Sequence, residues 1–301
     1  MIHDEIAWVL QRITVFRWFL FLFVVGVLIR YWRPPADGVP FRDWLRLRGR
    51  NLVMMYGLRP LTTKMDALVI AFLAPTLAGH GLLYHLGLPS LWHTVIGLVL
   101  LDFSFYVRHR LDHGVPILWR IHRVHHSDPC IDVTTSSFSH PLSAPLRTVW
   151  QGVAIALLGV PATAAFIFLF VEGYLGYLHH VGFTVEPLDR VLRCCGIVSP
   201  ENHRAHHARD LPVTDSNFGS IFSIWDRLFG TYRSIPAAQI RCGLPGFDTP
   251  GAQTIPALVL SPLRNLEAVD VPSGVAVRPV GQGVWRAFSI RAACQIDQIG
   301  D

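Results

Sequence analysis

The sequence predicts an all-α integral membrane protein with about four to five transmembrane helices, formed by an N-terminal span and two hairpins, under a cytosolic, histidine-rich helical cap. Only 16% of the 301 residues are charged and the mean hydropathy is +0.38, whereas soluble domains carry about a quarter charged residues. Long uncharged segments account for this deficit. Of the 15 histidines, 11 fall between positions 109 and 207, so the middle of the chain is unusually dense in imidazole groups.

The first predicted hairpin lies in residues 67–101, which contain no Asp, Glu, Lys or Arg. One helix of that length would measure about 52 Å, too long for a single crossing of a hydrocarbon core about 30 Å thick. The turn signal at Gly87-Leu88-Pro89 divides the segment into helices at about 67–86 and 89–107. The apolar residues 13–29 are interrupted only by Arg17 and lack a small-residue cleavage site, so we expect one anchoring span there.

A second uncharged segment, residues 148–171, allows two interpretations because it contains Gly159-Val160-Pro161. It forms either one kinked span or a hairpin with helices at about 145–159 and 162–180. The loop between residues 30 and 66 carries eight basic and three acidic residues, which places it in the cytoplasm by the positive-inside rule. The first hairpin then returns the chain to the cytoplasmic side near residue 108.

Charge and cysteine content argue against other classes of protein. The net charge is +5 and the pI about 9.2, but the arginines do not form the basic face of a nucleic-acid-binding domain. We therefore expect no nucleic-acid partner. The five cysteines are odd in number and include no Cys-x-x-Cys pair, which argues against a disulfide framework and a zinc ribbon.

Three histidine motifs follow the predicted spans: His109-Arg-Leu-Asp-His113, His122-Arg-Val-His125-His126 and His203-Arg-Ala-His206-His207. Helical residues three or four apart share a face, so the first and last histidine of each motif would point to one place. His125 and His206 are rotated from these by about 100°. Such a motif can offer imidazoles to two neighbouring metal ions, and neutral imidazole suits iron, zinc, copper or nickel.

A structural role is the main alternative for isolated histidines. We expect His80, His85 and His93 to be core or interfacial residues and His3 to lie on the surface. A structural zinc site needs about four ligands and is usually rich in cysteine. Eight histidines in three motifs exceed what one such ion can use.

A shared metal centre also decides between the two interpretations of residues 148–171. One crossing would put the third motif across the membrane from the other two. A hairpin with Pro161 at its tip keeps all three motifs on the cytoplasmic side. It also brings His179 and His180 to that side, and we expect one of them to join the cluster.

Local signals extend two of the motifs. One helical stripe carries Asp102, Tyr106, His109 and His113. The Asp102 carboxylate could accept the second ring N–H of a ligating histidine, or it could pair with Arg108 or Arg110, and the spacing leaves both open. Ser199-Pro200-Glu201 provides an N-cap, a proline and an early acid for a short helix that carries the third motif.

These motifs resemble those of the fatty acid hydroxylase/sterol desaturase superfamily of integral-membrane histidine-box di-iron oxygenases. The resemblance covers about residues 65–233. Besides the histidine motifs and their Asp102-x3-Tyr106 prefix, it rests on three further segments: Ser139-His140-Pro141, Asn217-Phe218-Gly219 and Trp225-Asp226-Arg227-Leu228-Phe229-Gly230-Thr231. One departure is Ser143, where many members have Glu.

The resemblance implies hydroxylation or desaturation of C–H bonds in a membrane lipid, such as a sterol or a fatty acyl chain, with O2 as co-substrate. Two iron ions are the implied cofactor, and zinc is expected to be able to replace them in a purified form. Carried over residue by residue, the metal ligands and catalytic residues are His109, His113, His122, His125, His126, His203, His206 and His207, with His180 as a ninth ligand. Residues expected beside them are Asp102, Tyr106, His140, His179, Asn217 and Asp226, and whether His140 ligates is open.

The resemblance also bears on partners and location. The sequence contains no glycine-rich flavin or dinucleotide motif, so the electrons are expected from an external donor, either a cytochrome b5-like protein or a ferredoxin with its reductase. Cytoplasmic arginines either follow the positive-inside rule alone or dock an acidic carrier or anionic headgroups. The expected location is the bacterial inner membrane or the endoplasmic reticulum, with the cap on the cytoplasmic side.

We expect three segments along the chain. Residues 1–64 form the N-terminal span and basic loop, residues 65–233 the catalytic domain, and residues 234–301 a cytoplasmic extension that packs over the cap. Two alternatives remain: a metal-binding membrane transport or storage protein, and a non-catalytic lipid-binding member of the family. A transporter needs polar ligands within its spans, whereas these clusters lie just outside them, and the intact motifs argue against a non-catalytic member.

Overall fold

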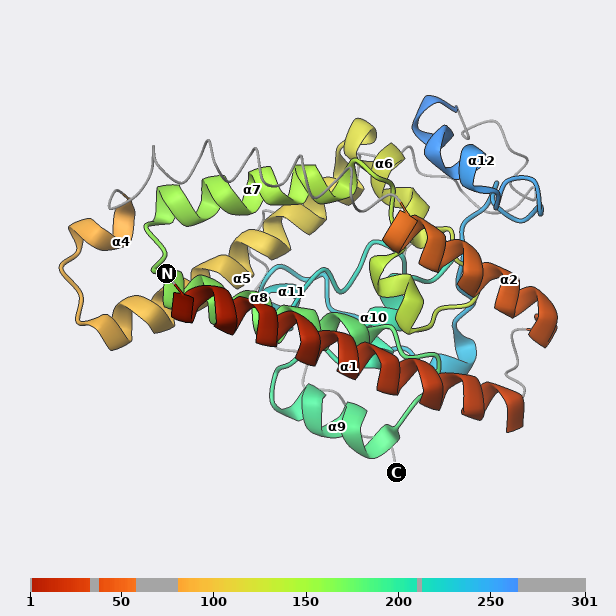
Figure 1. Ribbon diagram of the computed structural model, residues 1–301, viewed down its shortest axis with the longest axis horizontal. Coiled ribbons are helices and arrows are strands. Elements are labelled where there is room, and N and C mark those ends of the chain that lie inside the picture. The colour runs from red at the N-terminus through yellow and green to blue at the C-terminus, as the bar shows by residue number, and fades with distance from the viewer. Residues whose placement is uncertain (1, 33–37, 58–80, 210–212, 265–301) are drawn as a thin grey trace.

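The computed structural model describes residues 2–32, 38–57, 81–209 and 213–264, and these residues form helices and contain no β-strand (Figure 1). Four helices make up most of the membrane part: α1 (Ile2–Trp32), α5 (Ser90–Gly114), α7 (Ser143–Leu158) and α8 (Ala162–His179). Within the described residues, three stretches are long and apolar enough to cross a bilayer: Thr14–Trp32, Ser90–Gly114 and Ala162–His179. The first of these confirms that the predicted N-terminal span is helical and apolar.

The first predicted hairpin is described only in part. Residues 67–80 of its first helix lie outside the described residues, and α4 (Leu82–His85) precedes a turn at Gly87, whose φ is 58°. The second helix, α5, starts at Ser90 as expected but ends at Gly114 rather than near residue 107. The uncharged pattern marks the membrane segment and not the helix end, which comes where extended Val115 precedes Pro116.

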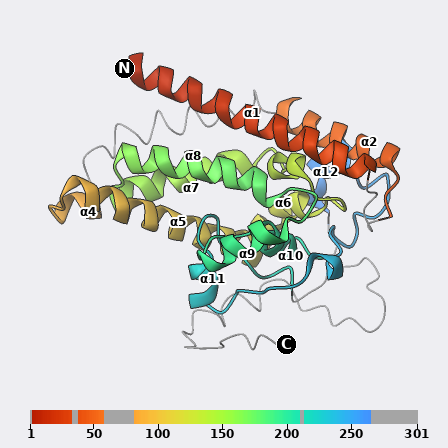
Figure 2. The same cartoon turned by 90° about the horizontal axis from the view of Figure 1, so that it is seen from below.

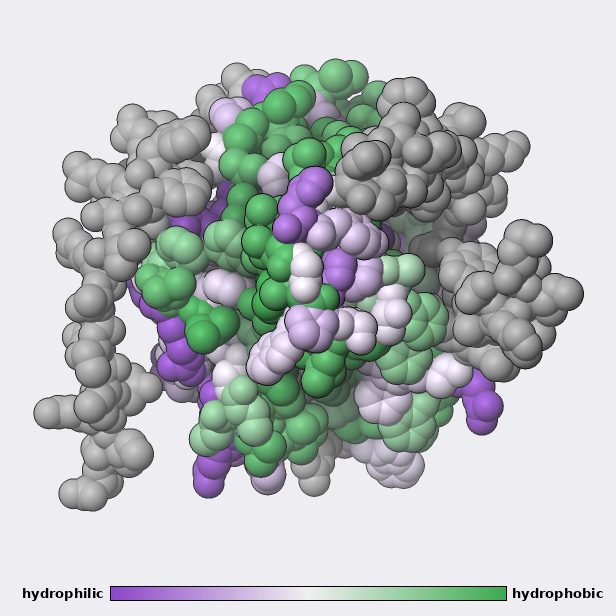
Figure 3. All heavy atoms as spheres, turned by 90° about the vertical axis from the view of Figure 1, so that its left-hand side faces the viewer, coloured by the Kyte–Doolittle hydropathy of each residue, from purple (hydrophilic) through white to green (hydrophobic). Residues whose placement is uncertain are grey.

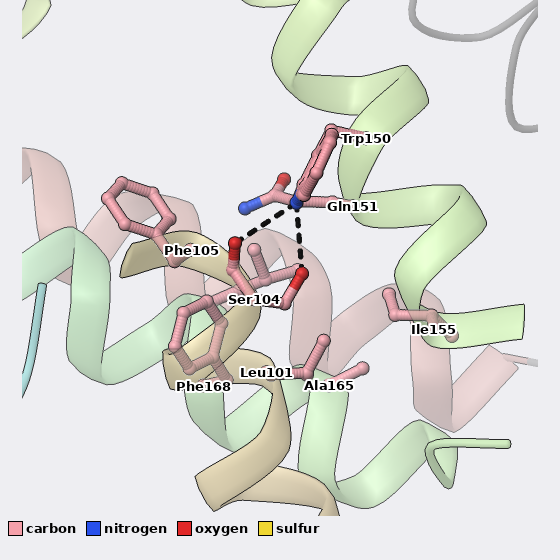
Figure 4. Close-up of a pocket in the computed structure, with 9 residues that line it drawn as sticks. Leu101, Ser104, Phe105, Trp150, Gln151, Ile155, Ala165 and Phe168 are labelled. Carbon is pink, nitrogen blue, oxygen red and sulfur yellow. Dashed lines mark hydrogen bonds between the residues drawn. The ribbon is translucent and has the colours of Figure 1, made fainter. Parts of the chain in front are cut away.

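The second hairpin is formed by α7 and α8. Gly159 ends α7 with a left-handed φ of 69°, and Pro161 stands before α8. The helices therefore agree with the predicted hairpin at residues 145–159 and 162–180. Trp150 Nε1 of α7 donates to the carbonyl and hydroxyl oxygens of Ser104 on α5, at 3.1 and 2.9 Å (Figure 4). α7 has only 16 residues, about 24 Å of helix, which is shorter than the hydrocarbon core.

The long helices pack in layers, with α1 along α8 and α5 beside α7 and α8 (Figure 2). One apolar core joins Leu101 of α5 to Ala164 and Phe168 of α8. The outward faces stay apolar as well, which is expected of lipid-facing helices: Leu20, Phe21, Leu28, Leu91, Trp92 and Leu157 are all exposed. Figure 3 shows that hydrophobic residues cover much of the end of the molecule that carries α4.

Short helices and loops form a cap at the other end of the bundle: α2 (Phe41–Leu52), η1 (Val53–Gly57), α6 (Pro116–His126), η2 (Val133–Ser137), α9 (Glu186–Cys194), α10 (Pro200–His206), α11 (Ile224–Leu228), η3 (Ala237–Gln239), α12 (Ile255–Val259) and η4 (Ser261–Leu263). The C-terminal segment packs on this cap as far as residue 264, because Arg123 of α6 donates to the carbonyls of Ser261 and Arg264. Residues 265–301 lie outside the described residues.

A buried ion-pair network anchors α2 to the loop before η2. Arg48 contacts the Asp128 carboxylate at 2.8 Å and the Asp132 carboxylate at 2.5 Å, and Asn51 Nδ2 donates to Asp128 at 2.8 Å. Burial alone would raise the pKa of Asp128, but the Arg48 and Arg50 guanidiniums hold it below its usual value. Arg48 and Arg50 are 1% and 8% exposed, so neither is the surface arginine that the positive-inside pattern predicts.

Candidate metal centre

The structure brings all nine predicted ligands together. The first histidine group contains His109, His113, His122, His126 and His206, and the second contains His125, His180, His203 and His207. Within each group, one ring nitrogen from every member lies within 4.8 Å of the others. The two groups adjoin, since the rings of His126 and His207 stack with their centroids 4.5 Å apart.

Helical spacing explains how the motifs divide between the groups. On α6, His122 and His126 share one face and enter the first group, whereas the rotated His125 enters the second. At α10, His203 and His207 enter the second group and His206 enters the first. The predicted rotation of about 100° thus supplies each group from both motifs.

The start of α10 is fixed by the signals that the sequence contains. Ser199 caps the helix by accepting the Asn202 N–H, and Pro200 occupies the first turn. Glu201 pairs with Arg193 of α9 at 2.5 Å. These contacts set the position of the third motif relative to the hairpin end that carries His180.

Backbone carbonyls set the protonation of two members of the second group, His125 and His180. His125 Nδ1 lies 2.9 Å from the Phe138 carbonyl, and His180 Nδ1 lies 2.6 Å from the Gly176 carbonyl. A carbonyl only accepts, so each Nδ1 carries the ring proton and each Nε2 presents a lone pair. Yet the two Nε2 atoms face each other at 3.3 Å. Two acceptors at that distance repel, and a metal cation between them satisfies both.

The first group contains buried ring nitrogens of the same kind. His109 Nδ1 donates to the Phe218 carbonyl at 3.0 Å and His206 Nδ1 to the Ser216 carbonyl at 2.8 Å. His206 Nε2 and His113 Nε2 are buried without a hydrogen-bond partner in the described part of the chain. A buried acceptor without a partner is costly, so this all-imidazole donor set also fits a transition metal.

Burial lowers the pKa of all four imidazoles of the second group, which gives the stability of the metal-free protein a defined pH dependence. Burial lowers the pKa of His125 from 6.5 to about 4. Between these two pKa values the unfolded chain binds a proton that the metal-free folded chain does not bind. The contribution of neutral His125 to folding stability is therefore full above pH 6.5 and declines as the pH falls toward 4. We expect the metal-free protein to lose about 2 kcal/mol from His125 alone between pH 6.5 and 5.

Thermal unfolding of chelator-treated protein at pH 7, 6 and 5 checks this dependence. The metal-loaded protein is the control and should respond less over the same range, because bound metal competes with the proton for the ring nitrogen. An unfolding temperature that stays constant from pH 7 to 5 in the metal-free protein would contradict the expectation.

His140 and His179 lie near the centre but belong to neither group. His140 uses both ring nitrogens, since Nε2 donates to the Val259 carbonyl at 3.0 Å and Nδ1 accepts the Leu142 N–H at 3.1 Å. His179 Nε2 donates to the Val198 carbonyl at 2.9 Å. Of the adjacent pair, His180 is therefore the one that joins the cluster.

The other four histidines lie away from the centre or outside the description. His85 is exposed, and His93 donates from Nε2 to the Gly159 carbonyl at 2.8 Å, as a core residue would. His80 and the side chain of His3 fall outside the described residues.

Asp102 has neither of the partners that the sequence left open. Its carboxylate accepts the backbone N–H groups of Ile221 and Phe222 and the indole N–H of Trp225, at 2.9, 3.3 and 2.7 Å. The reason is distance, because His109 follows two helical turns later, about 10.5 Å along α5. Asp102 instead attaches the segment that precedes α11 to the membrane helix.

The Asn-Phe-Gly segment positions His109 and His206. Asn217 adopts a left-handed φ of 52° and donates from Nδ2 to the Asn202 and Arg233 carbonyls. The neighbouring carbonyls of Ser216 and Phe218 then receive the two histidine N–H groups. Gly219 is required next, since a Cβ there would lie 2.5 Å from the Phe222 carbonyl oxygen.

Asp226 and Tyr106 hold the Asn-Phe-Gly segment through hydrogen bonds. The Asp226 carboxylate accepts the N–H groups of Phe218 and Gly219, both at 2.8 Å, and the Thr231 hydroxyl at 2.7 Å. Tyr106 Oη lies 3.0 Å from that same hydroxyl oxygen. Both residues thus contact the candidate metal centre through the backbone and not through a histidine ring.

We expect Asp226→Asn to weaken metal binding by the first histidine group about 10- to 100-fold, the usual effect of losing an outer partner. The amide keeps one acceptor oxygen and turns an N–H group toward a backbone N–H. Competition with a chelator of known affinity measures the change. Asp248→Asn, at an exposed ion pair with Arg209, is the matched control, and equal affinities in the two variants would contradict the expectation.

Sequence reasoning missed Asp215 and the carbonyl partners of the histidines. The Asp215 carboxylate lies 3.2 Å from His113 Nδ1 and fixes that ring. It comes from a loop with no helical or motif spacing to His113, and a backbone carbonyl leaves no mark on residue type. One signal was available from residue type alone: asparagine is enriched at positive φ, the conformation that Asn217 adopts.

A cavity of about 340 Å³ lies beside the histidines. His109, His122, His125, His180 and His203 form one side of it. Phe105, Val15 and Tyr177, from α5, α1 and α8, form apolar parts of the wall, and serines from η2 to the start of α7 form a polar part. The cavity therefore connects both histidine groups with the membrane helices.

Comparisons with known proteins agree with the motifs. Residues 94–231 match the model of the fatty acid hydroxylase family. An ornithine lipid hydroxylase of Rhizobium tropici is 30% identical over 58% of this chain and 52% of its own length. Human alkylglycerol monooxygenase is 29% identical over 50% of this chain and 33% of its own length. Human cholesterol 25-hydroxylase is 30% identical over 49% of this chain and 54% of its own length. The chain thus spans between a third and about half of these relatives, and no solved structure matches it.

Proposed function

We propose that this chain, whose residues 94–231 match the model of the fatty acid hydroxylase family, is an O2-dependent di-iron enzyme that hydroxylates a C–H bond of a membrane lipid. The observation that carries the proposal is the pair of adjoining histidine groups beside a cavity walled by membrane helices. A lipid that enters from the bilayer would reach the histidines through that cavity. The boundaries at residues 64 and 233 and the roles of the nine ligands are part of this proposal.

Each histidine group would hold one iron ion, and iron there would supply the activation of O2 and the cleavage of an unactivated C–H bond, which side-chain acid–base chemistry does not achieve. The protein's own part is positional. Carbonyls of Phe138, Gly176, Ser216 and Phe218 fix the ring protons on Nδ1, which leaves Nε2 free to bind metal. The apolar parts of the cavity wall would exclude water and align the substrate carbon.

Hydroxylation is favoured over desaturation because the three relatives are named as hydroxylases or monooxygenases. Their names cover an ornithine lipid, an alkylglycerol and cholesterol, so a polar or neutral membrane lipid is the proposed substrate class. A cytochrome b5-like protein, or a ferredoxin with its reductase, would deliver the electrons. The cap would face the cytoplasm, which the basic residues before residue 66 support.

Metal analysis combined with an isotope experiment tests the proposal. Purified protein, a chemical reductant and ¹⁸O2 are incubated with a total membrane lipid extract, and the products are resolved by mass spectrometry. We expect two metal ions per chain, and one ¹⁸O atom in a lipid product that depends on iron. Two metal ions with no oxidised or desaturated lipid would contradict an oxygenase and favour metal transport or storage. Fewer than two ions would contradict the di-iron centre.

A further inference from the structure

Three charged residues lie on the membrane helices that wall the cavity. Arg108 is near the cap end of α5, Arg147 is the single charged residue of α7, and Glu172 is the single acidic or basic residue of α8 apart from His179. All three line the cavity of about 340 Å³. Ionisable residues in membrane helices are costly and face a partner or a polar cavity, so their convergence calls for a ligand.

The internal partners of these three residues are unequal. Arg108 is already paired with Asp112 at 2.5 Å. Arg147 is exposed and Glu172 is half-buried, and neither has an ion pair among the described residues. One guanidinium and one carboxylate, on two helices that both pack against α5, therefore lack an ion pair.

The wall between these charges and the histidines is polar as well. Ser136, Ser137, Ser139 and Ser143 line it, and the Ser143 hydroxyl oxygen is buried without a hydrogen-bond partner in the described part of the chain. A buried hydroxyl without a partner costs free energy that a ligand would recover. A plain acyl chain would leave all of these groups unsatisfied, and a sterol has a single hydroxyl to offer them.

We propose that this cavity binds the headgroup of a zwitterionic lipid that carries both an anionic group and a primary ammonium. Arg147, with Arg108 beside it, binds the phosphate or carboxylate oxygens, since a guanidinium matches both geometrically. Glu172 accepts the ammonium N–H groups. The inference rests on the proposed function only in that it places the lipid in the same cavity as the histidine groups.

The volume agrees with a headgroup. Pockets for small molecules usually measure about 300 to 1,000 Å³, and this cavity lies at the lower end of that range. It holds a headgroup and the bonds next to it, while the acyl chains of a diacyl lipid stay in the bilayer beside α1, α7 and α8.

A lipid-retention experiment on the full-length, metal-loaded protein tests the proposal without turnover. Detergent-purified protein is equilibrated with equimolar dioleoyl phosphatidylethanolamine, dioleoyl phosphatidylcholine and dioleoylglycerol, with Nα-oleoyl-lysine in a parallel sample. The retained lipid is quantified by mass spectrometry. We expect phosphatidylethanolamine to be retained about tenfold over dioleoylglycerol and over phosphatidylcholine, which has no N–H group. Stronger retention of oleoyl-lysine would identify the anionic group as a carboxylate, and weaker retention would identify it as a phosphate.

Variants assign the preference to the two free charges. Glu172→Gln should remove the preference for phosphatidylethanolamine over phosphatidylcholine. Arg147→Gln should remove the preference for either phospholipid over dioleoylglycerol. Arg190→Gln and Glu186→Gln, at an exposed pair on α9, are the matched controls. Arg147→Lys and Glu172→Asp keep the charges and should keep part of the selectivity.

Two results would overturn the proposal. One is equal retention of all lipids by the wild-type protein, which needs no variant to fold. The other is a headgroup preference that survives both neutral substitutions. Because retention is measured in the absence of reductant and O2 consumption, a failure here leaves the oxygenase proposal standing. A protein that selects headgroups but oxidises no lipid would refute only the oxygenase proposal.

Discussion

His125→Ala should reduce the metal content from two ions per chain to one. The second histidine group has four members, so the substitution leaves three ligands and removes the ring whose Nε2 faces His180 at 3.3 Å. Loss of an outer partner already weakens metal binding about 10- to 100-fold, and loss of a ligand should exceed that. Lipid oxidation should fall to background, because the proposed reaction needs both ions.

His206→Ala tests the first group through its metal affinity. That group keeps four ligands after the substitution, so we expect weaker binding in a chelator competition rather than complete loss of one ion. The exposed His85→Ala is the control for removal of an imidazole from the surface. Wild-type metal content in both His125→Ala and His206→Ala would refute the two-metal interpretation.

The division into two groups could be predicted because helix geometry is local. The rotation of His125 relative to His122 and His126 depends only on the residues per turn, and α6 forms over these residues. The hairpin at Pro161 was also predictable, since the histidines must meet on one side of the membrane. Motif spacing and topology therefore predicted most of the candidate metal centre.

Contacts that depend on tertiary structure could not be predicted in this way. Asp102 lies on the same helical stripe as His109, yet its partners are backbone groups of Ile221 and Phe222, more than a hundred residues away. The end of α5 could not be predicted from hydropathy for a related reason, because hydropathy reports lipid contact and α5 continues into the cap. Only the helical stripe from Asp102 to His113 indicated the longer helix.

Arg48 shows the same limit most clearly. In the sequence it is one of eight basic residues between positions 30 and 66, and the positive-inside rule treats all of them alike. The structure buries it against Asp128 and Asp132. Both aspartates lie at least 80 residues away from Arg48 in the chain. Composition cannot distinguish a guanidinium that faces lipid headgroups from one that organises a loop.

Arg48→Met should destabilise the folded protein by about 3 to 5 kcal/mol, the usual cost of removing one partner of a buried ion pair. Asp128 and Asp132 would keep their burial and lose the guanidinium that lies 2.8 and 2.5 Å away. Arg50 remains, but its nearest contact with Asp128 is 3.8 Å. The free energy of unfolding, measured by denaturant titration in detergent, checks the magnitude.

The same substitution should reach the metal centre through the loop that Arg48 holds. Arg48 also donates to the Thr134 hydroxyl of η2 at 3.2 Å, and η2 leads to Phe138, whose carbonyl fixes His125. Metal affinity of the second histidine group should therefore fall in Arg48→Met and recover partly in Arg48→Met with Asp128→Asn, which removes the unpaired charge.

Arg46→Met, at an exposed pair on the same helix, should change stability by less than about 0.5 kcal/mol. Arg48→Met with wild-type stability would show that the α2 network is dispensable, and a stability loss with unchanged metal affinity would show that it acts on the fold but not on His125.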